Sequence, residues 1–95
     1  MTHKIVVCDP NGFELRTISA ALAMQGIMVS GETDNTSTAL NMCRNLKPSV
    51  VLISLGKSVT EPLELGKKLR KNDPQIGIVY FTTAVDIRLI GVHEE

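Results

Sequence analysis

Short apolar runs recur along the chain at nearly even intervals. They begin at Ile5, Ile27, Val50 and Ile76, and the residues between them carry apolar side chains at helical spacing. Strands that alternate with helices in this way are typical of repeated βαβ units, which build parallel sheets. The pattern therefore predicts an α/β fold with four parallel strands, at about residues 5–8, 27–31, 50–53 and 76–81.

Three complete helices are predicted between these strands. Gly26 follows the first helix, where a glycine commonly ends a helix, and Pro62 stands near the start of the third, where its missing N–H costs little. A further helical pattern begins near Asp86 and continues to Glu95. The side chains predicted to face the core are Leu15, Ile18 and Leu22 in the first helix, Ala39, Leu40 and Cys43 in the second, which ends at Leu46, and Leu65 and Leu69 in the third.

The third apolar run indicates the centre of the sheet. Residues 50–53 are four branched aliphatic residues in a row, as expected of a strand buried on both faces, whereas residues 27–31 alternate like an edge strand. Right-handed crossovers then give the strand order 2-1-3-4. Open α/β sheets bind ligands beyond the carboxyl ends of their strands, so Asp9, Ser54 and Thr82 are predicted to lie near one another.

Composition narrows the classes of function. The 95 residues fit one domain, and ten basic residues balance ten acidic ones, so charge gives no reason to expect nucleic acid or an anionic membrane surface. No apolar run is long enough to span a bilayer, and the first residues read as a strand rather than a secretion signal. Cys8 and Cys43 are expected to be reduced core residues of a cytoplasmic protein.

The predicted cluster of a carboxylate and two hydroxyls favours hydrogen bonding over catalysis. Activation of Ser54 as a nucleophile would need a neighbouring base, and the sequence places no histidine or lysine beside it. His3 and His93 lie near the chain ends. The chain is therefore not expected to be an enzyme.

The pattern as a whole resembles the receiver domain of two-component response regulators. The resemblance covers the whole chain and includes the segments KIVVCDPNGF, LKPSVVLISL and IGIVYFTT. It implies a flavodoxin-like fold of three layers, with residues 1–95 forming a single receiver-like domain truncated at about the fourth helix. The fifth strand and fifth helix of that fold would lie beyond Glu95.

The resemblance also implies where the phosphorylation chemistry of the family would stand. Asp9 matches the first acid, but Pro10 stands in place of the second, and Ser54 stands at the acceptor aspartate. Thr82 matches the hydroxyl of the fourth strand, and Gly56 could offer a backbone carbonyl to a metal. One carboxylate makes a poor magnesium site. The resemblance thus implies a degenerate phospho-acceptor pocket of Asp9, Ser54, Gly56 and Thr82, with no metal and no cofactor.

A degenerate receiver, or pseudo-receiver, is expected to act as a regulatory input or dimerisation domain that is not phosphorylated by the aspartate route. By resemblance, a protein partner or a second copy would bind through the region of the fourth strand and fourth helix. DNA binding would require an output domain that these residues do not include.

An alternative is a small phosphatase-like or phosphotransfer protein that uses Cys8 and the following loop. Low-molecular-weight phosphatases place an arginine after five intervening residues, whereas Arg16 follows Cys8 after seven. Asp9 would also raise the pKa of the thiol, which disfavours the reactive thiolate.

Overall fold

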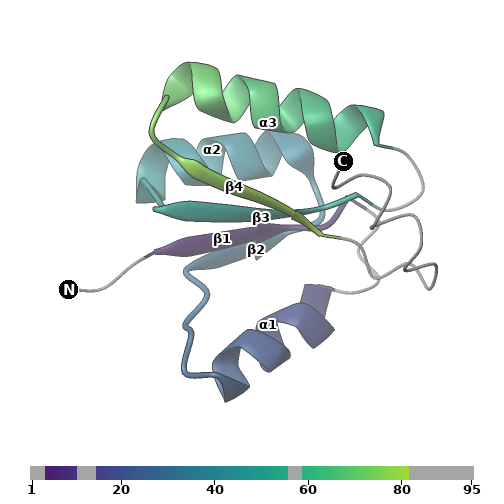
Figure 1. Ribbon diagram of the computed structural model, residues 1–95, viewed down its shortest axis with the longest axis vertical. Coiled ribbons are helices and arrows are strands. Elements are labelled where there is room, and N and C mark those ends of the chain that lie inside the picture. The colour runs from purple at the N-terminus through teal and green to yellow at the C-terminus, as the bar shows by residue number, and fades with distance from the viewer. Residues whose placement is uncertain (1–3, 11–14, 56–58, 82–95) are drawn as a thin grey trace, which may run out of the picture.

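A computed structural model describes residues 4–10, 15–55 and 59–81, and all structural statements below concern these residues. Strands and helices alternate along them, as the sequence pattern predicts (Figure 1). The elements are β1 (Ile5–Cys8), α1 (Leu15–Met24), β2 (Gly31–Thr33), α2 (Thr36–Leu46), β3 (Val50–Ser54), α3 (Thr60–Asn72) and β4 (Gly77–Phe81). The predicted helix from residue 86 lies outside the described residues.

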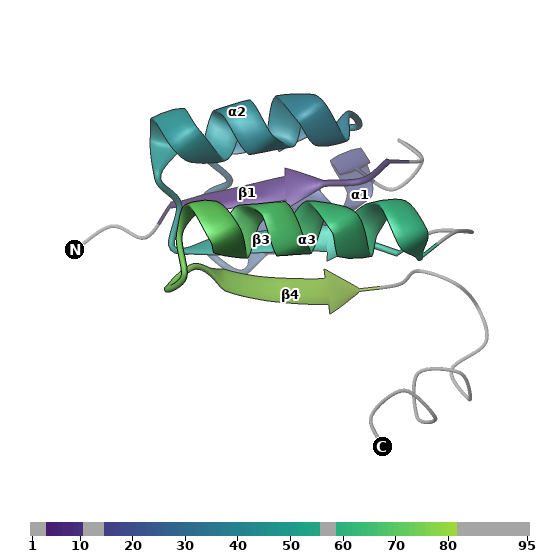
Figure 2. The same ribbon diagram turned by 90° about the horizontal axis from the view of Figure 1, so that it is seen from above.

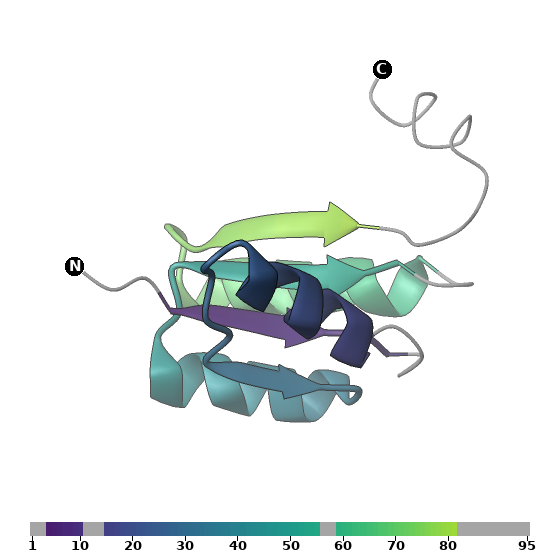
Figure 3. The same ribbon diagram turned by 90° about the horizontal axis from the view of Figure 1, so that it is seen from below.

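The strands form one parallel sheet in the order β2-β1-β3-β4, which confirms the predicted order. Helices α2 and α3 lie side by side on one face of this sheet (Figure 2), and α1 lies on the other (Figure 3). This is the predicted three-layer arrangement, with β1 and β3 at its centre. None of the helices within the described residues is long and apolar enough to cross a membrane.

The predicted bounds of the second strand are wrong: β2 begins at Gly31, not at Ile27. Gly26 ends α1 with a φ of 79°, its N–H donates to the carbonyl of Ala23 (2.9 Å), and the N–H of Ile27 donates to that of Leu22 (2.9 Å). This pair of bonds is the Schellman motif. Residues 27–30 then carry the chain from α1 to the edge of the sheet, so their alternating exposure does not mark a strand.

Helix α2 ends at Leu46, as predicted, and both of its ends are capped. The side chain of Asn35 accepts a hydrogen bond from the backbone N–H of Thr38 (3.0 Å), as an N-cap does. At the other end Lys47 has a φ of 52°, and its N–H donates to the carbonyl of Cys43 (3.0 Å). This left-handed residue ends the helix and turns the chain toward β3.

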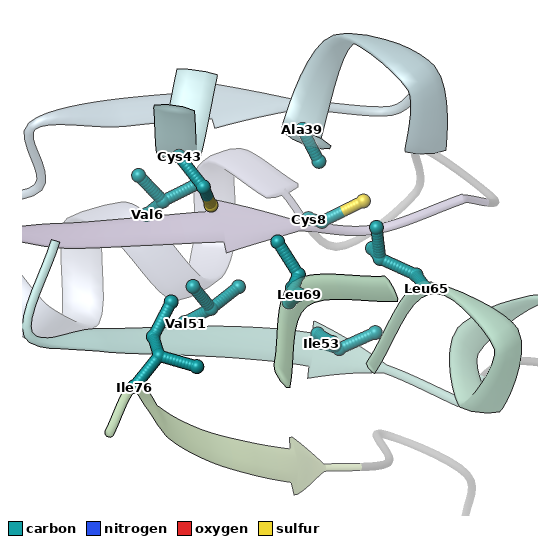
Figure 4. Packing of buried hydrophobic residues seen from close by; sticks show 9 residues of the cluster. All are labelled: Val6, Cys8, Ala39, Cys43, Val51, Ile53, Leu65, Leu69 and Ile76. Carbon is teal, nitrogen blue, oxygen red and sulfur yellow. The ribbon is translucent and has the colours of Figure 1, made fainter. Parts of the chain in front are cut away.

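The main core lies between the sheet and helices α2 and α3 (Figure 4). Four of the side chains predicted to face inward are buried there, whereas Leu40 and the three on α1 are only half-buried. Helix α1 packs on β1 and β2 alone on its face of the sheet, so its apolar stripe is less enclosed. The buried cluster consists of Val6, Cys8, Ala39, Cys43, Val51, Ile53, Leu65, Leu69 and Ile76.

Helix α3 and strand β4 approach each other closely at Gly66. A Cβ atom at this position would overlap the hydroxyl of Tyr80, so the ring of Tyr80 lies directly over the helix backbone. A glycine in the middle of a helix usually lowers its stability. Here it provides the space that the Tyr80 hydroxyl occupies.

Candidate functional site

Asp9 and Ser54 lie at the same edge of the sheet, at the carboxyl ends of its two central strands. The register between β1 and β3 pairs Cys8 with Ile53, so the next residue of each strand brings Asp9 opposite Ser54. Only 1% of Asp9 and 2% of Ser54 is exposed. They are the buried polar side chains of the described part of the chain, and the sequence pattern led to both.

Backbone hydrogen bonds fix these strand ends. The N–H of Asp9 donates to the carbonyl of Thr33 at the end of β2 (3.0 Å), and the N–H of Leu55 donates to that of Phe81 at the end of β4 (2.9 Å). Every buried side-chain nitrogen and oxygen of the described residues has a hydrogen-bond partner. The buried carboxylate of Asp9 has an interaction partner within the protein, as buried polar groups usually do.

Thr82 and Gly56, the other two members of the predicted pocket, lie outside the described residues. Their participation stays a prediction. In the described part of the chain, the candidate site therefore consists of Asp9 and Ser54 with the ends of the strands on either side.

Two cavities lie between α2 and α3, away from this pair. One of about 340 Å³ lies at the C-terminal ends of both helices, and one of about 250 Å³ at their N-terminal ends. Neither Asp9 nor Ser54 lines them, so neither cavity is the predicted pocket. The larger is lined by Cys43, Arg44, Lys47, Leu69, Asn72, Asp73 and Ile76, and the smaller by Thr36, Ser37, Leu40, Glu61, Glu64, Leu65 and Lys68.

Two acidic residues that the sequence did not single out lie near the same edge. Glu61 accepts a hydrogen bond from the hydroxyl of Thr36 (3.5 Å), which joins the first turns of α2 and α3. Asp34 directly follows β2. The negative charges of Glu61 and Asp34 both help to raise the pKa of the Cys8 thiol. The sequence could have indicated both residues. Asp34 follows a strand and Glu61 stands in the first turn of a helix, and such positions meet at the carboxyl edge of a parallel sheet.

The residues at this edge do not fit the magnesium ion that receiver chemistry requires. Mg²⁺ prefers an octahedral set of oxygen ligands and usually draws on clustered carboxylates. Asp9 is the one buried carboxylate in the described residues, Pro10 has no side-chain oxygen, and Ser54 offers a neutral hydroxyl. The described residues contain no group of three or more metal-ligating side chains arranged to hold a metal. No reaction step through a metal follows from this arrangement.

Cys8 is a buried core residue, and the phosphatase-like alternative finds no support. Its side chain lies in the core on the face covered by α2 and α3 (Figure 4), whereas Arg16 is an exposed residue of α1 on the opposite face. Burial, followed by the charge of Asp9, raises the pKa of the Cys8 thiol to about 12. Burial also raises the pKa of Cys43 to about 11.

Both cysteines are therefore expected to react slowly with iodoacetamide at neutral pH, because the thiolate is the reactive form and both thiols are buried. Intact-mass measurements over time check this expectation. The same chain in denaturant serves as the control and should be alkylated twice within the time that leaves the folded protein unmodified. Rapid alkylation of folded Cys8 would contradict its burial and its raised pKa.

The curated proteins similar to this chain are response regulators. The chain is 32% identical over 80 residues to the response regulator GacA of Pseudomonas aeruginosa, and 31% identical over 80 residues to GacA of Pseudomonas syringae pv. syringae. Each match covers 83% of this chain, but the chain spans only 37% of the length of either relative. No protein-family model matches the chain.

Solved structures with the same fold are receiver domains and response regulators. The isolated receiver domain of RcsB from Salmonella enterica serovar Typhimurium superposes with a TM-score of 0.74 at 17% identity, over 99% of this chain and 71% of that one. A LuxR-family response regulator from Aurantimonas has a TM-score of 0.77 at 19% identity, over 99% of this chain and 69% of that one. In sequence the chain is similar to response regulators, and in fold it has the flavodoxin-like architecture of receiver domains.

Proposed function

We propose that this chain is a pseudo-receiver, a regulatory domain that keeps the receiver scaffold without the aspartate phosphorylation switch. The observation that carries the proposal is Ser54, which ends the central strand β3 directly opposite Asp9. By the resemblance to receivers, this is the place of the acceptor aspartate, and Pro10 takes the place of the second acid.

The chemistry of the pair supports this proposal. Receiver chemistry transfers a phosphoryl group to a carboxylate, with metal and cationic groups that stabilise the charge on its oxygens. The Ser54 hydroxyl is neutral and buried, and the single carboxylate of Asp9 is already satisfied within the protein. The site therefore lacks both the acceptor and the metal ligands that the transfer would use.

A domain of this kind acts by binding rather than by catalysis. We place its binding surface on β4 and the segment that follows it, with a protein partner or a second copy as the occupant. GacA is a response regulator, and the RcsB structures include one bound to promoter DNA, so the longer relatives support a role in signalling or transcription regulation. DNA binding would belong to an output domain outside these 95 residues. Two free, buried thiols suit the reducing cytoplasm.

Incubation with acetyl phosphate and Mg²⁺ is expected to leave the mass of the protein unchanged, because no carboxylate occupies the acceptor position. Beryllofluoride with Mg²⁺ is expected to leave its melting temperature unchanged for the same reason. Intact-mass spectrometry and thermal denaturation check the two expectations.

A receiver domain that has the acceptor aspartate and both acids serves as the control under the same conditions. It should gain the mass of one phosphoryl group and should be stabilised by beryllofluoride. A phosphoryl adduct on this chain, or its stabilisation by beryllofluoride, would refute the proposal.

A further inference from the structure

The larger cavity lies between the C-terminal ends of α2 and α3, two helices that are neighbours on one face of the sheet (Figure 2). Its volume is about 340 Å³. Ligand pockets in proteins range from about 300 to 1,000 Å³, so a cavity of this size suits a small molecule. The residues that line it form an apolar floor and a charged rim.

The floor of the larger cavity is made of buried side chains. Cys43 on α2, Leu69 on α3 and Ile76 before β4 line it, and none of the three is more than 4% exposed. Burial raises the pKa of Cys43 to about 11, so its thiol is neutral and acts as a small apolar group. The floor therefore favours an apolar group on a ligand.

The rim carries charges of opposite sign on its two sides. Arg44 and Lys47 line the cavity from the end of α2, and they are three residues apart, so they lie on the same side of the helix. Asp73, the C-cap of α3, lines the cavity from the other side. A ligand with one anionic and one cationic group would therefore meet a complementary charge on each side.

The acidic side of the rim is held in place by its own turn. The Oδ1 atom of Asp73 accepts a hydrogen bond from the backbone N–H of Gln75 (3.0 Å). An ionised carboxylate accepts several hydrogen bonds, so Asp73 can also bind an ammonium group. The last carbonyls of α2 and α3 add to this preference, because helix C-termini carry partial negative charge and favour cations.

The two cavities differ in whether side chains join α2 to α3 across them. In the smaller cavity, the hydroxyl of Thr36 donates to Glu61 (3.5 Å) and so links the two helices. Across the larger cavity, no hydrogen bond or ion pair between described residues links Arg44 or Lys47 to Asp73. The charges on its two sides can therefore bind a ligand without breaking a bond between the helices.

We propose that the larger cavity binds a free α-amino acid with an apolar side chain. The carboxylate of the amino acid binds Arg44 and Lys47, its ammonium group binds Asp73 and the helix ends, and its side chain packs on the floor. This site goes beyond the proposed function and does not depend on it, because it lies at the opposite edge of the sheet from Asp9 and Ser54.

Isothermal titration calorimetry and thermal denaturation of the 95-residue chain with L-leucine test this binding. One molecule is expected to bind per chain, and the melting temperature should rise with its concentration, because a ligand that binds only the folded state stabilises it. Isocaproate lacks the ammonium group of leucine and isoamylamine lacks its carboxylate. Each should bind at least about tenfold more weakly than leucine, since each loses a charge-assisted interaction.

Two neutral substitutions test the two sides of the rim. Arg44→Gln removes a cation and Asp73→Asn removes the anion, while the asparagine oxygen can still accept from Gln75. Each should weaken the binding of leucine about tenfold. Arg70→Gln and Asp34→Asn, at exposed positions that do not line the cavity, are the matched controls and should leave binding unchanged. Circular dichroism verifies that all four variants are folded.

Amide chemical shifts of the parent chain locate the site without any substitution. Leucine should shift the signals of Lys47 and Asp73, which line the cavity, and should leave those of Asp9 and Ser54 unchanged.

Three results would overturn amino-acid binding at this site. They are the absence of saturable leucine binding, binding of isocaproate as tight as that of leucine, and chemical-shift changes confined to residues outside the cavity. Leucine binding that Arg44→Gln and Asp73→Asn leave unchanged would also contradict it, and would mean that these side chains only complement the helix ends. None of these results depends on the response to a phosphodonor, so the pseudo-receiver proposal and the amino-acid site fail independently.

Discussion

Replacing Leu69 with alanine is expected to lower the free energy of unfolding by about 3 kcal/mol, as large-to-small substitutions in protein cores do. Leu69 is 1% exposed and belongs to the cluster that joins α3 to the sheet. The substitution removes apolar surface from the cluster that also includes Cys8, Val51 and Ile53 on the two central strands, and it leaves a cavity beneath the helix. Urea denaturation followed by circular dichroism measures the loss.

Leu63→Ala in the same helix is the matched control. Leu63 is 42% exposed, so its truncation should change the free energy of unfolding by no more than about 0.5 kcal/mol. Equal losses for the two variants would mean that α3 does not pack on the sheet through Leu69, and that the core described here is wrong.

The fold was predictable because the clearest apolar run in the sequence also indicates which strand lies at the centre of the sheet. The unbroken run at 50–53 identifies a strand buried on both faces, and the right-handed crossover rule then leaves the order 2-1-3-4. The bounds of β2 were not predictable in the same way. Residues 27–30 connect α1 to β2, and in this connection exposed Met28 and Ser30 alternate with half-buried neighbours. A half-buried strand would show the same alternation.

The candidate site was predictable only in part. Asp9 and Ser54 were found because a polar residue after a buried strand must lie at the carboxyl edge of the sheet. Their complete burial, and the positions of Asp34 and Glu61 near Cys8, follow from packing between elements that are far apart in the sequence. No local pattern encodes that packing, so the sequence placed Asp9 and Ser54 at this edge but did not indicate how deeply they are buried.

Ser54→Asp is expected to destabilise the domain at pH 7 by about 3 kcal/mol, the Coulomb energy of two like charges on neighbouring strands at an effective dielectric constant near 20. The new carboxylate would be buried opposite Asp9, since the register of β1 and β3 places these positions side by side. Thermal and urea denaturation at several pH values measure the loss. Ser54→Asn, which is equal in size to the aspartate and neutral, is the matched control.

The pH dependence distinguishes charge repulsion from crowding. A buried pair of carboxyls keeps a proton to a higher pH than the unfolded chain, where a carboxyl titrates near pH 4. The folded variant then binds more protons than the unfolded one, so its stability falls as pH rises from about 4, and the penalty disappears below that pH. Mg²⁺ should restore part of the stability at pH 7, because it neutralises the pair. The contrary result is an equal loss of stability for Ser54→Asp and Ser54→Asn at every pH, with no effect of Mg²⁺. That result would show that position 54 does not face Asp9.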